Sequence, residues 1–382
     1  MQYRTAALLT CPYDNHFPLN LKAFKETPVP AEILKPRALD CQDYCHLNNT
    51  AKIDSTDCRE CRTRLIEEGV LFCPECRRLY PIRDHIASFL PDELRGEDDL
   101  SDLDLARLPE KMREAARGMT DKNAVVQEGV EDRLSEMNKR DEESDLYDKL
   151  YPRRASMAEI DLVLRELEPL PGEVILDAGC GTGRITTEIL PRSGDLVGVD
   201  FSFESLRFLW NRTGEAERTK LHLVQADLSL LPLRKHSVDR ALSISTICFL
   251  PTRDLRSASL KAIAGALRPG GVLVASVYNY AFMKKVLGFF RLSSVGKKEG
   301  YHSGGSIRYY NYDRQEYLDF LYDGFEVLNL TGSDHRLPLL SKIHPSLTAA
   351  IDRWLERRSL SIPIFAREML ATCRKGGEAI TP

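Results

Sequence analysis

From about residue 151 onward, short apolar runs alternate with longer stretches in which apolar residues recur at helical spacing. The runs are typical of buried strands and the longer stretches of amphipathic helices. Helices are expected at Glu204–Trp210 and Arg256–Leu267, and Pro269-Gly270-Gly271 should end the second and turn into the next strand. The expected strands are Val174–Leu176, Asp195–Val199, Leu221–Gln225, Arg240–Ile244 and Val272–Val277. This alternation predicts an α/β fold with a doubly wound parallel sheet.

The rest of the chain differs in composition. Residues 1–95 are punctuated by prolines and hold seven of the ten cysteines, whereas residues 96–150 are acidic, strongly charged and helix-prone. We therefore predict three parts: a small α+β domain over residues 1–95, a helical linker over 96–150, and the sheet domain over 151–382.

A glycine-rich turn follows the first strand of the predicted sheet. The strand ends at Asp177, and glycines stand at positions 179, 181 and 183. Glycine lets the backbone turn tightly and lets a ligand approach the main chain. Residues Arg184–Leu190 are expected to form a helix whose N-terminus faces that ligand. A strand, a glycine turn and a helix together predict a nucleotide-type site at the end of the sheet.

The glycine spacing identifies the kind of ligand. A dinucleotide fingerprint G-x-G-x-x-G would need a third glycine where Thr182 or Thr186 stands. The pattern is instead D-x-G-x-G-x-G, which resembles motif I of the class I methyltransferases. The resemblance implies a Rossmann-like sheet and S-adenosylmethionine as cofactor. It also implies that the end of the linker, before the sheet, closes over the cofactor as a helix.

Further acidic residues end the next two strands. Asp200 follows the second strand, where a carboxylate can accept hydrogen bonds from a ribose diol. Asp227 follows the third, and the resemblance assigns it to the adenine amino group, with Leu228 beside the ring. Cys180 is expected to fill space rather than act as a nucleophile. The predicted cofactor-binding residues are Asp177, Gly179, Cys180, Gly181, Gly183, Asp200, Phe201, Asp227, Leu228 and Ser243.

The cysteine spacing predicts zinc in the N-terminal part. Cys73 and Cys76 form a C-x-x-C pair, and Cys11 precedes Asp14 where a matching cysteine would stand, so Asp14 or His16 would complete a four-ligand site. A second Cys₄ site is also expected, with His46 as a spare ligand; its cysteines are Cys41, Cys45, Cys58 and Cys61. The alternatives are one site with spare cysteines, or buried free thiols.

The segments around Cys11 and Cys73–Pro91 also resemble a known module. This is the small zinc-binding activator protein that pairs with methyltransferases acting on tRNA, rRNA and a release factor. The resemblance implies that the N-terminal domain packs in cis on an apolar face of the methyltransferase domain and stabilises it.

Charge and hydropathy narrow the partners. The formal net charge of −4 excludes a global basic field for nucleic acid. No apolar run approaches the ~20 residues of a membrane span, and the apolar stretch at the N-terminus is too short for a signal peptide. A cytoplasmic location is therefore expected.

The sequence is compatible with more than one class of methyl acceptor. A small-molecule or lipid-like acceptor is favoured by the apolar segment Ala281–Phe290 and by the lack of an Asn-Pro-Pro-aromatic motif after the fourth strand. The alternative is a translation component, such as tRNA modified at a wobble uridine, and a cofactor-binding scaffold protein is a third reading. Whether a general base is used is left open. Candidate acceptor-side residues are Tyr278, Asn279, His302, Tyr309 and Tyr310, and a basic rim is formed by Lys284, Lys285, Arg291, Lys297 and Lys298.

Overall fold

The computed structural model describes most of the chain. The described residues are 1–34, 44–51, 59–95, 105–119, 129–150, 157–281, 298–302, 307–335 and 366–376, with the single positions 347, 350 and 354. Among them, none of the helices combines the length and apolar character needed to cross a bilayer.

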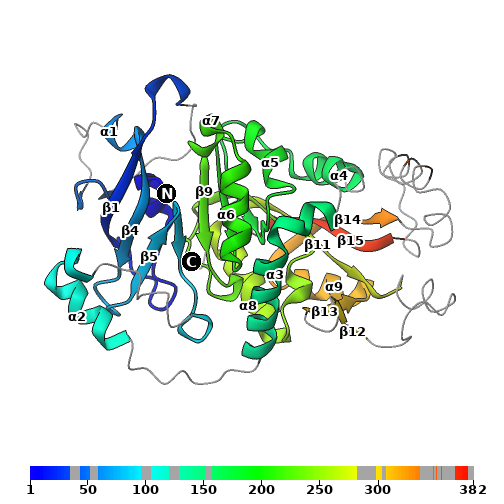
Figure 1. Ribbon diagram of the computed structural model, residues 1–382. Coiled ribbons are helices and arrows are strands. Elements are labelled where there is room, and N and C mark those ends of the chain that lie inside the picture. The colour runs from blue at the N-terminus through cyan, green and yellow to red at the C-terminus, as the bar shows by residue number, and fades with distance from the viewer. Residues whose placement is uncertain are drawn as a thin grey trace, which may run out of the picture.

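The described strands form one large mixed sheet of 13 strands and a separate small hairpin (Figure 1). The order in the large sheet is β1-β4-β5-β6-β9-β8-β7-β10-β11-β13-β12, with β15 paired to β11 and β14 to β15. Its N-terminal strands are β1 (Asn20–Pro28), β4 (Arg64–Phe72), β5 (Leu79–Arg83) and β6 (Ile86–Ser88). Its central strands are β7 (Val174–Ala178), β8 (Asp195–Asp200), β9 (Leu221–Gln225), β10 (Val238–Ser243) and β11 (Leu267–Asn279). Its last strands are β12 (Glu299–His302), β13 (Ile307–Tyr312), β14 (Phe325–His335) and β15 (Ala366–Lys375), and the hairpin is β2 (Tyr44–Cys45) with β3 (Thr50–Ala51).

Helices cover both faces of the central strands. The α-helices are α1 (Arg59–Arg62), α2 (Glu110–Met119), α3 (Val130–Leu150), α4 (Met157–Leu167), α5 (Thr186–Ile189), α6 (Phe203–Arg212), α7 (Glu215–Arg218), α8 (Arg253–Ala266) and α9 (Arg314–Leu321). Short 3₁₀ segments include η1 (Tyr3–Leu8), η3 (Asp92–Leu94), η7 (Leu190–Arg192), η8 (Leu228–Leu230) and η9 (Ile247–Phe249).

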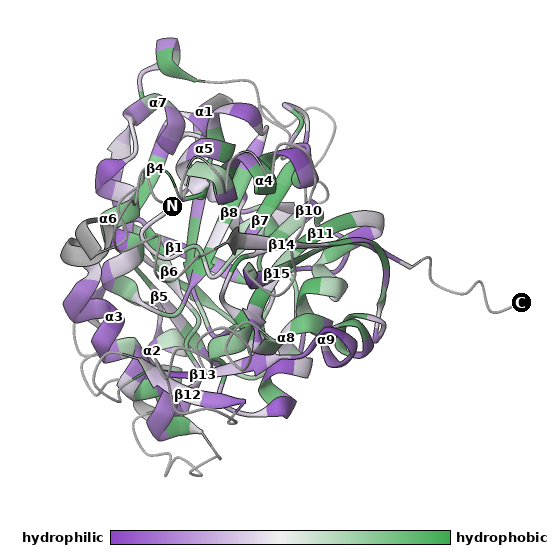
Figure 2. Ribbon diagram, turned by 90° about the vertical axis from the view of Figure 1, so that its right-hand side faces the viewer, coloured by the Kyte–Doolittle hydropathy of each residue, from purple (hydrophilic) through white to green (hydrophobic). Residues whose placement is uncertain are grey.

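Two apolar cores lie on the two faces of the sheet. Successive residues of β7 alternate between them, because neighbouring side chains of a strand point to opposite faces. One core joins β7 to α4 and α6, and the other joins it to α8, α9 and η1. The hydropathy colouring shows green central strands, whereas α3 is mostly purple (Figure 2). The predicted doubly wound architecture is confirmed.

All five strands predicted from the sequence are present, and Leu221–Gln225 has the predicted bounds. The expected turn at Pro269-Gly270-Gly271 is wrong, since these residues lie inside β11. The pairing of β10 with β11 shifts register here, and Gly270 takes a φ of +76°, so the irregularity is absorbed within the strand. Helix α8 begins before the predicted Arg256, at Arg253, because the Thr252 hydroxyl accepts a hydrogen bond from the N–H of Leu255.

The N-terminal strands extend the central sheet. Strand β6 pairs in parallel with β9, with Ala87 opposite Val224 and Ser88 opposite Gln225. The N–H of Phe89 continues this ladder to the carbonyl of Gln225, at 2.7 Å. The cis packing expected for the N-terminal part therefore includes edge-to-edge strand pairing. Figure 1 shows the blue N-terminal strands beside β9. The three-part division of the chain stays a prediction; α2 packs on the N-terminal strands, and α3 packs on α6 and β13.

A buried polar network reinforces this junction. The Arg4 guanidinium lies 3.2 Å from Asp195, at the start of β8, and His222 Nε2 on β9 lies 2.9 Å from the same carboxylate oxygen. The Thr5 hydroxyl lies 2.7 Å from the other ring nitrogen of His222. All four side chains are buried, so two residues of η1 are fixed to two strands of the central sheet.

Replacing Asp195 by alanine should destabilise the chain by about 3–5 kcal/mol, because Arg4 would be left buried without its counter-charge. Urea unfolding followed by circular dichroism measures the change. The matched control is Asp323→Ala, which removes an exposed ion pair with Lys261 and should cost about 1 kcal/mol or less. Equal stability of the two variants would show that the buried network contributes nothing special.

Candidate functional site

The glycine turn after β7 packs closely against neighbouring side chains at two of its glycines and is open at the third. Gly179, Gly181 and Gly183 have φ values of +90°, +51° and +84°, which side chains rarely adopt. A Cβ at Gly179 would lie 2.2 Å from Thr246, and one at Gly183 would lie 2.2 Å from Leu209. At Gly181 nothing lies within 4 Å. Two of the glycines therefore allow the turn to pack, and the third exposes backbone that a ligand can approach.

Asp200 joins this turn to the end of β8. Its Oδ2 accepts a hydrogen bond from the N–H of Gly181 at 2.8 Å, and its Oδ1 accepts one from the N–H of Ser202 at 3.0 Å. Burial raises its pKa above the ordinary value for aspartate. A carboxylate offers about four lone-pair sites, so Asp200 keeps acceptor capacity for a ribose diol.

Asp177 and Cys180 are enclosed in the same turn. The Thr186 hydroxyl donates to Asp177 at 2.7 Å, and burial raises the pKa of Asp177 to about 7. Burial also raises the pKa of the Cys180 thiol well above its usual range, which agrees with a space-filling role and not with a nucleophile. The helix expected over Arg184–Leu190 is shorter: α5 covers Thr186–Ile189 and continues into the 3₁₀ turn η7. One α-helical turn cannot supply the helix N-terminus that the sequence suggested.

Both carboxylate oxygens of Asp227 are in contact with polar groups of the protein. Its Oδ1 caps η8 by accepting from the N–H and hydroxyl of Ser229, and its Oδ2 lies 2.8 Å from the Arg133 guanidinium of α3. Its assignment to adenine stays a prediction. Two more of the predicted cofactor-binding residues, Leu228 and Ser243, are buried. The Ser243 hydroxyl, at the end of β10, has no hydrogen-bond partner among the described residues. Phe201, directly after Asp200, is partly buried.

Helix α3 contributes residues that the sequence reasoning missed. Arg133, Glu136 and Arg140 follow the i, i+3, i+7 spacing of one helical face, and the exposure of Arg133 and Glu136 is only 3% and 7%. The next residue, Asp141, accepts hydrogen bonds from the hydroxyl of Ser202 and the N–H of Glu204. The helix is therefore held against the carboxyl ends of β8 and β9 by polar contacts. In the sequence, the spacing of these charged residues does not distinguish a buried face from a solvated one.

Half-buried aromatic rings gather at the carboxyl end of β11. Tyr278 packs edge-on against Phe249 and Tyr309, with ring centroids 5.6 Å apart in both pairs. The Arg367 guanidinium of β15 lies 5.0 Å from the centroid of Tyr278. These residues follow the same sheet edge as Ser243, so Tyr278 lies where an acceptor-side group was expected.

The other acceptor-side candidates stand differently. The Asn279 amide donates to the carbonyl of Ala366 at 2.9 Å and accepts from the N–H of Ala281 at 3.0 Å, so it serves the fold. Tyr310 donates to Glu316. The side chain of His302 lies outside the described residues, as do Lys284, Lys285, Arg291 and Lys297. Lys298 is paired with Asp313 and Glu316.

A buried carboxylate from the last strand fixes the loop after β10. Glu368 accepts hydrogen bonds from the hydroxyls of Ser245 at 2.7 Å and Ser276 at 3.0 Å. The N–H of Ser245 in turn donates to the Ser276 hydroxyl. Ser245 takes a φ of +52°, which this network stabilises. No local signal in the sequence marks Glu368, because β15 reaches the loop from more than 120 residues away.

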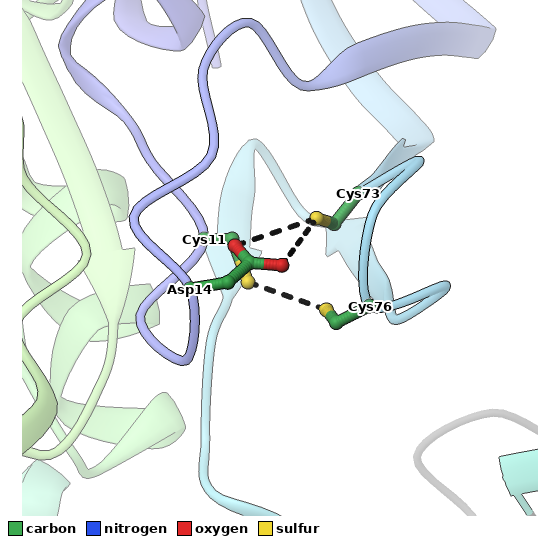
Figure 3. Close-up of side chains that lie close together, drawn as sticks. All are labelled: Cys11, Asp14, Cys73 and Cys76. Carbon is green, nitrogen blue, oxygen red and sulfur yellow. Dashed lines mark hydrogen bonds between the residues drawn. The ribbon is translucent and has the colours of Figure 1, made fainter.

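The metal-ligand cluster predicted in the N-terminal part is present. Cys11, Asp14, Cys73 and Cys76 each offer a ligand atom, and these atoms lie within 4.8 Å of one another (Figure 3). The Sγ atoms of Cys11 and Cys76 are 3.4 Å apart, and Cys73 Sγ is 3.3 Å from a carboxylate oxygen of Asp14. Three thiols and one carboxylate fit a tetrahedral zinc ion. Asp14 therefore offers the fourth ligand atom, whereas His16 contributes backbone groups: its N–H donates to Asp14, and its carbonyl accepts from the N–H of Cys11.

The second predicted zinc site is not tested. Cys41 and Cys58 lie outside the described residues. Cys45 and Cys61 are buried, and His46 is buried beside Tyr44 and Phe17. Among the described residues, these three do not belong to a ligand cluster. This site stays a prediction.

Two protein families match this chain, one over the part that holds the metal-ligand cluster and one over the part that holds the glycine turn. Residues 2–84 match the family described as Trm112p-like protein, and residues 176–275 match the family described as methyltransferase domain. The chain joins a Trm112p-like domain to a methyltransferase domain. The fold of the second domain is that of the S-adenosylmethionine-dependent methyltransferases, and the ligand cluster of the first fits zinc, as the two resemblances implied.

Individual relatives cover only part of the chain. An O-methyltransferase of Pyrenophora dematioidea is 38% identical over 29% of this chain and 41% of its own length. A tRNA (carboxymethyluridine(34)-5-O)-methyltransferase of Arabidopsis thaliana is 31% identical over 35% of this chain and 31% of its own. A solved complex of the Haloferax volcanii Trm112 methyltransferase activator and a methyltransferase is 18% identical, with a TM-score of 0.44, over 64% of this chain and 97% of that one. The chain thus spans about two fifths or less of these two sequence relatives.

The methyltransferase domain fits its cofactor on its own geometry. The open backbone at Gly181 lies beside Asp200, and Asp177 is enclosed behind them. Asp200 would accept hydrogen bonds from the ribose diol of S-adenosylmethionine, and Ser243 would face the methyl-donor end. These residue roles remain predictions.

Proposed function

We propose that the chain transfers a methyl group from S-adenosylmethionine to a small-molecule or lipid-like acceptor. The observation that carries the proposal is the aromatic cluster of Phe249, Tyr278 and Tyr309, which follows the sheet edge that holds Asp200 and Ser243. Aromatic rings bind planar or apolar acceptors by stacking and by area burial. An O-methyltransferase is among the relatives, and its name specifies transfer to oxygen.

The chemistry requires alignment more than acid–base groups. When bound, the cofactor supplies an electrophilic methyl group together with its own leaving group. The protein residues then have to orient donor and acceptor, which can contribute about 7–11 kcal/mol. The Glu368 network serves this task by fixing the loop after β10, and the rings of Tyr278 and Tyr309 would orient the acceptor.

The Trm112p-like domain is proposed to stabilise the methyltransferase domain in cis. Support comes from the β6–β9 pairing and from the buried network of Arg4, Asp195 and His222. The cytoplasmic location and the domain limits at residues 95 and 150 stay predictions of the sequence.

Transfer of a labelled methyl group tests the acceptor class. The purified chain is incubated with methyl-labelled S-adenosylmethionine and a cell extract separated into RNA, protein and lipid or small-molecule fractions. We expect label in the lipid or small-molecule fraction. Label in RNA would favour the alternative, a tRNA methyltransferase like the Arabidopsis relative, and label in no fraction, with no binding of the cofactor, would contradict an enzymatic role.

A further inference from the structure

The buried face of α3 carries charged side chains beside the carboxyl ends of β8 and β9. Arg133 holds the helix to Asp227 at the end of β9, and Asp141 holds it to Ser202 just after β8. Glu136 lies between these two anchors on the same helix, and its exposure is 7%. The segment from Arg133 to Asp141 therefore spans the carboxyl ends of two strands whose acidic residues form the predicted site.

Glu136 faces charged and titratable groups from three elements. On α3, Arg140 lies 3.3 Å from its carboxylate, and Asp132 also interacts with it electrostatically, although Arg308 of β13 pairs with Asp132. Asp200 at the end of β8 and the Cys248 thiol of η9 complete the set. The Arg140 guanidinium also lies 5.1 Å from the ring centroid of Phe249 in η9. Glu136 therefore lies between Asp200, the predicted ribose ligand, and η9, in the loop that follows β10.

Three buried carboxylates are grouped beside α3. Asp177, Asp200 and Glu136 are all buried, and Asp200 is close enough to interact electrostatically with both of the others. Arg140 is the cation that offsets Glu136 and Asp200. Ionising a buried carboxyl group beside other carboxylates costs free energy, and a nearby cation offsets this cost. A positively charged ligand would therefore be favoured over a neutral one of the same shape.

We propose that Glu136 is a specificity residue that favours the sulfonium form of the cofactor over its demethylated product. The inference rests on the proposed function and adds to it a residue outside the family motifs. The methyl donor carries a positive sulfur, whereas the product is a neutral thioether with the same ribose, base and amino acid ends. Only the sulfur distinguishes them, so a carboxylate near that position discriminates by charge and helps the product to leave.

The proposal predicts a pH-dependent ratio of affinities. Burial, with repulsion from Asp200 and Asp132, raises the pKa of Glu136 to about 7. Glu136 is therefore largely protonated at pH 6 and largely ionised at pH 8. Binding of the cation favours the ionised form, so donor affinity rises with pH relative to product affinity. Burial also raises the pKa of Asp177 to about 7, so a pH dependence of the ratio that persists in Glu136→Gln would belong to Asp177 and would contradict the proposal.

Calorimetric titration with S-adenosylmethionine and S-adenosylhomocysteine at pH 6 and pH 8 tests this. For the unaltered chain, the ratio of product Kd to donor Kd should rise several-fold between the two pH values. In Glu136→Gln, donor affinity at pH 8 should fall about tenfold, product affinity should hold, and the ratio should no longer depend on pH. Glu142→Gln, on the same helix with a side chain that is 69% exposed, should behave like the unaltered chain.

The outcomes separate this proposal from the proposed function. If the unaltered chain binds neither ligand, both fail. If it binds both ligands with a ratio that does not change with pH, or if Glu136→Gln weakens both ligands equally, the charge-sensing role is wrong and the cofactor assignment stands. The pH series on the unaltered chain is independent of how well the variant folds, and Glu136→Asp should retain part of the discrimination.

Discussion

Replacing Asp200 by alanine is expected to weaken S-adenosylmethionine binding by a factor of about 100 or more. Two hydrogen bonds from a ribose diol to a carboxylate contribute about 1.5–3 kcal/mol each, and both would be lost. The N–H of Gly181 would also lose its acceptor, so the glycine turn would be less well ordered for a ligand. The chain should remain folded, because the strands around β8 pack through apolar residues of both cores.

Calorimetry gives the affinity, and circular dichroism with thermal unfolding checks the fold. Asp323→Ala, which changes an exposed carboxylate, should bind the cofactor like the unaltered chain. Asp200→Asn keeps an acceptor for Gly181 and should bind with intermediate affinity. Undiminished binding by Asp200→Ala would show that the ribose is held elsewhere, and the assignment of the site to the β8 edge would then be wrong.

The central fold was predictable because its signals are local. Apolar runs such as Val174–Leu176 are buried on both faces of the sheet, so the sequence marks them without reference to the rest of the chain. The glycine turn was predictable for a similar reason, since its positive φ values require glycine at fixed spacing. The candidate ligand Asp14 could also be predicted, with His16 as the alternative, because a C-x-x-C pair needs a partner pair and Asp14 stands at the matching offset from Cys11.

The missed features depend on contacts between distant segments. Strand β15 and its Glu368 reach the cofactor-side loop only through pairing with β11. Helix α3 packs by charged contacts, so its buried face resembles a solvated one in the sequence. The short α5 shows that a good apolar pattern does not ensure a long helix, since Pro191 stands in the following 3₁₀ turn and cannot donate a backbone hydrogen bond.

Removal of one zinc ligand is expected to unfold the Trm112p-like domain. In Cys73→Ala the cluster loses one of its three thiolates, and a structural zinc ion contributes about 10–16 kcal/mol of folding free energy. Strands β4 and β5 join at Cys73 and Cys76, so loss of the ion releases the hairpin that positions β6 against β9. Because burial raises the pKa of the Cys11 thiol to about 11 in the absence of metal, zinc binding must release protons and should weaken as the pH falls.

Zinc analysis by mass spectrometry and thermal unfolding measure both effects. Cys73→Ala should contain one equivalent of zinc fewer than the unaltered chain, whether or not Cys41, Cys45, Cys58 and Cys61 bind a second ion, and should show an early unfolding transition. Cys373→Ala is the matched control, because this cysteine is buried in β15 and lies outside the ligand cluster; its zinc content should not change. A Cys73→Ala variant that keeps its full zinc content, or an unaltered chain that is folded without metal, would contradict a structural role for the cluster. In that case the β6–β9 junction would depend on the buried Arg4–Asp195–His222 network, and Asp195→Ala rather than Cys73→Ala would separate the two domains.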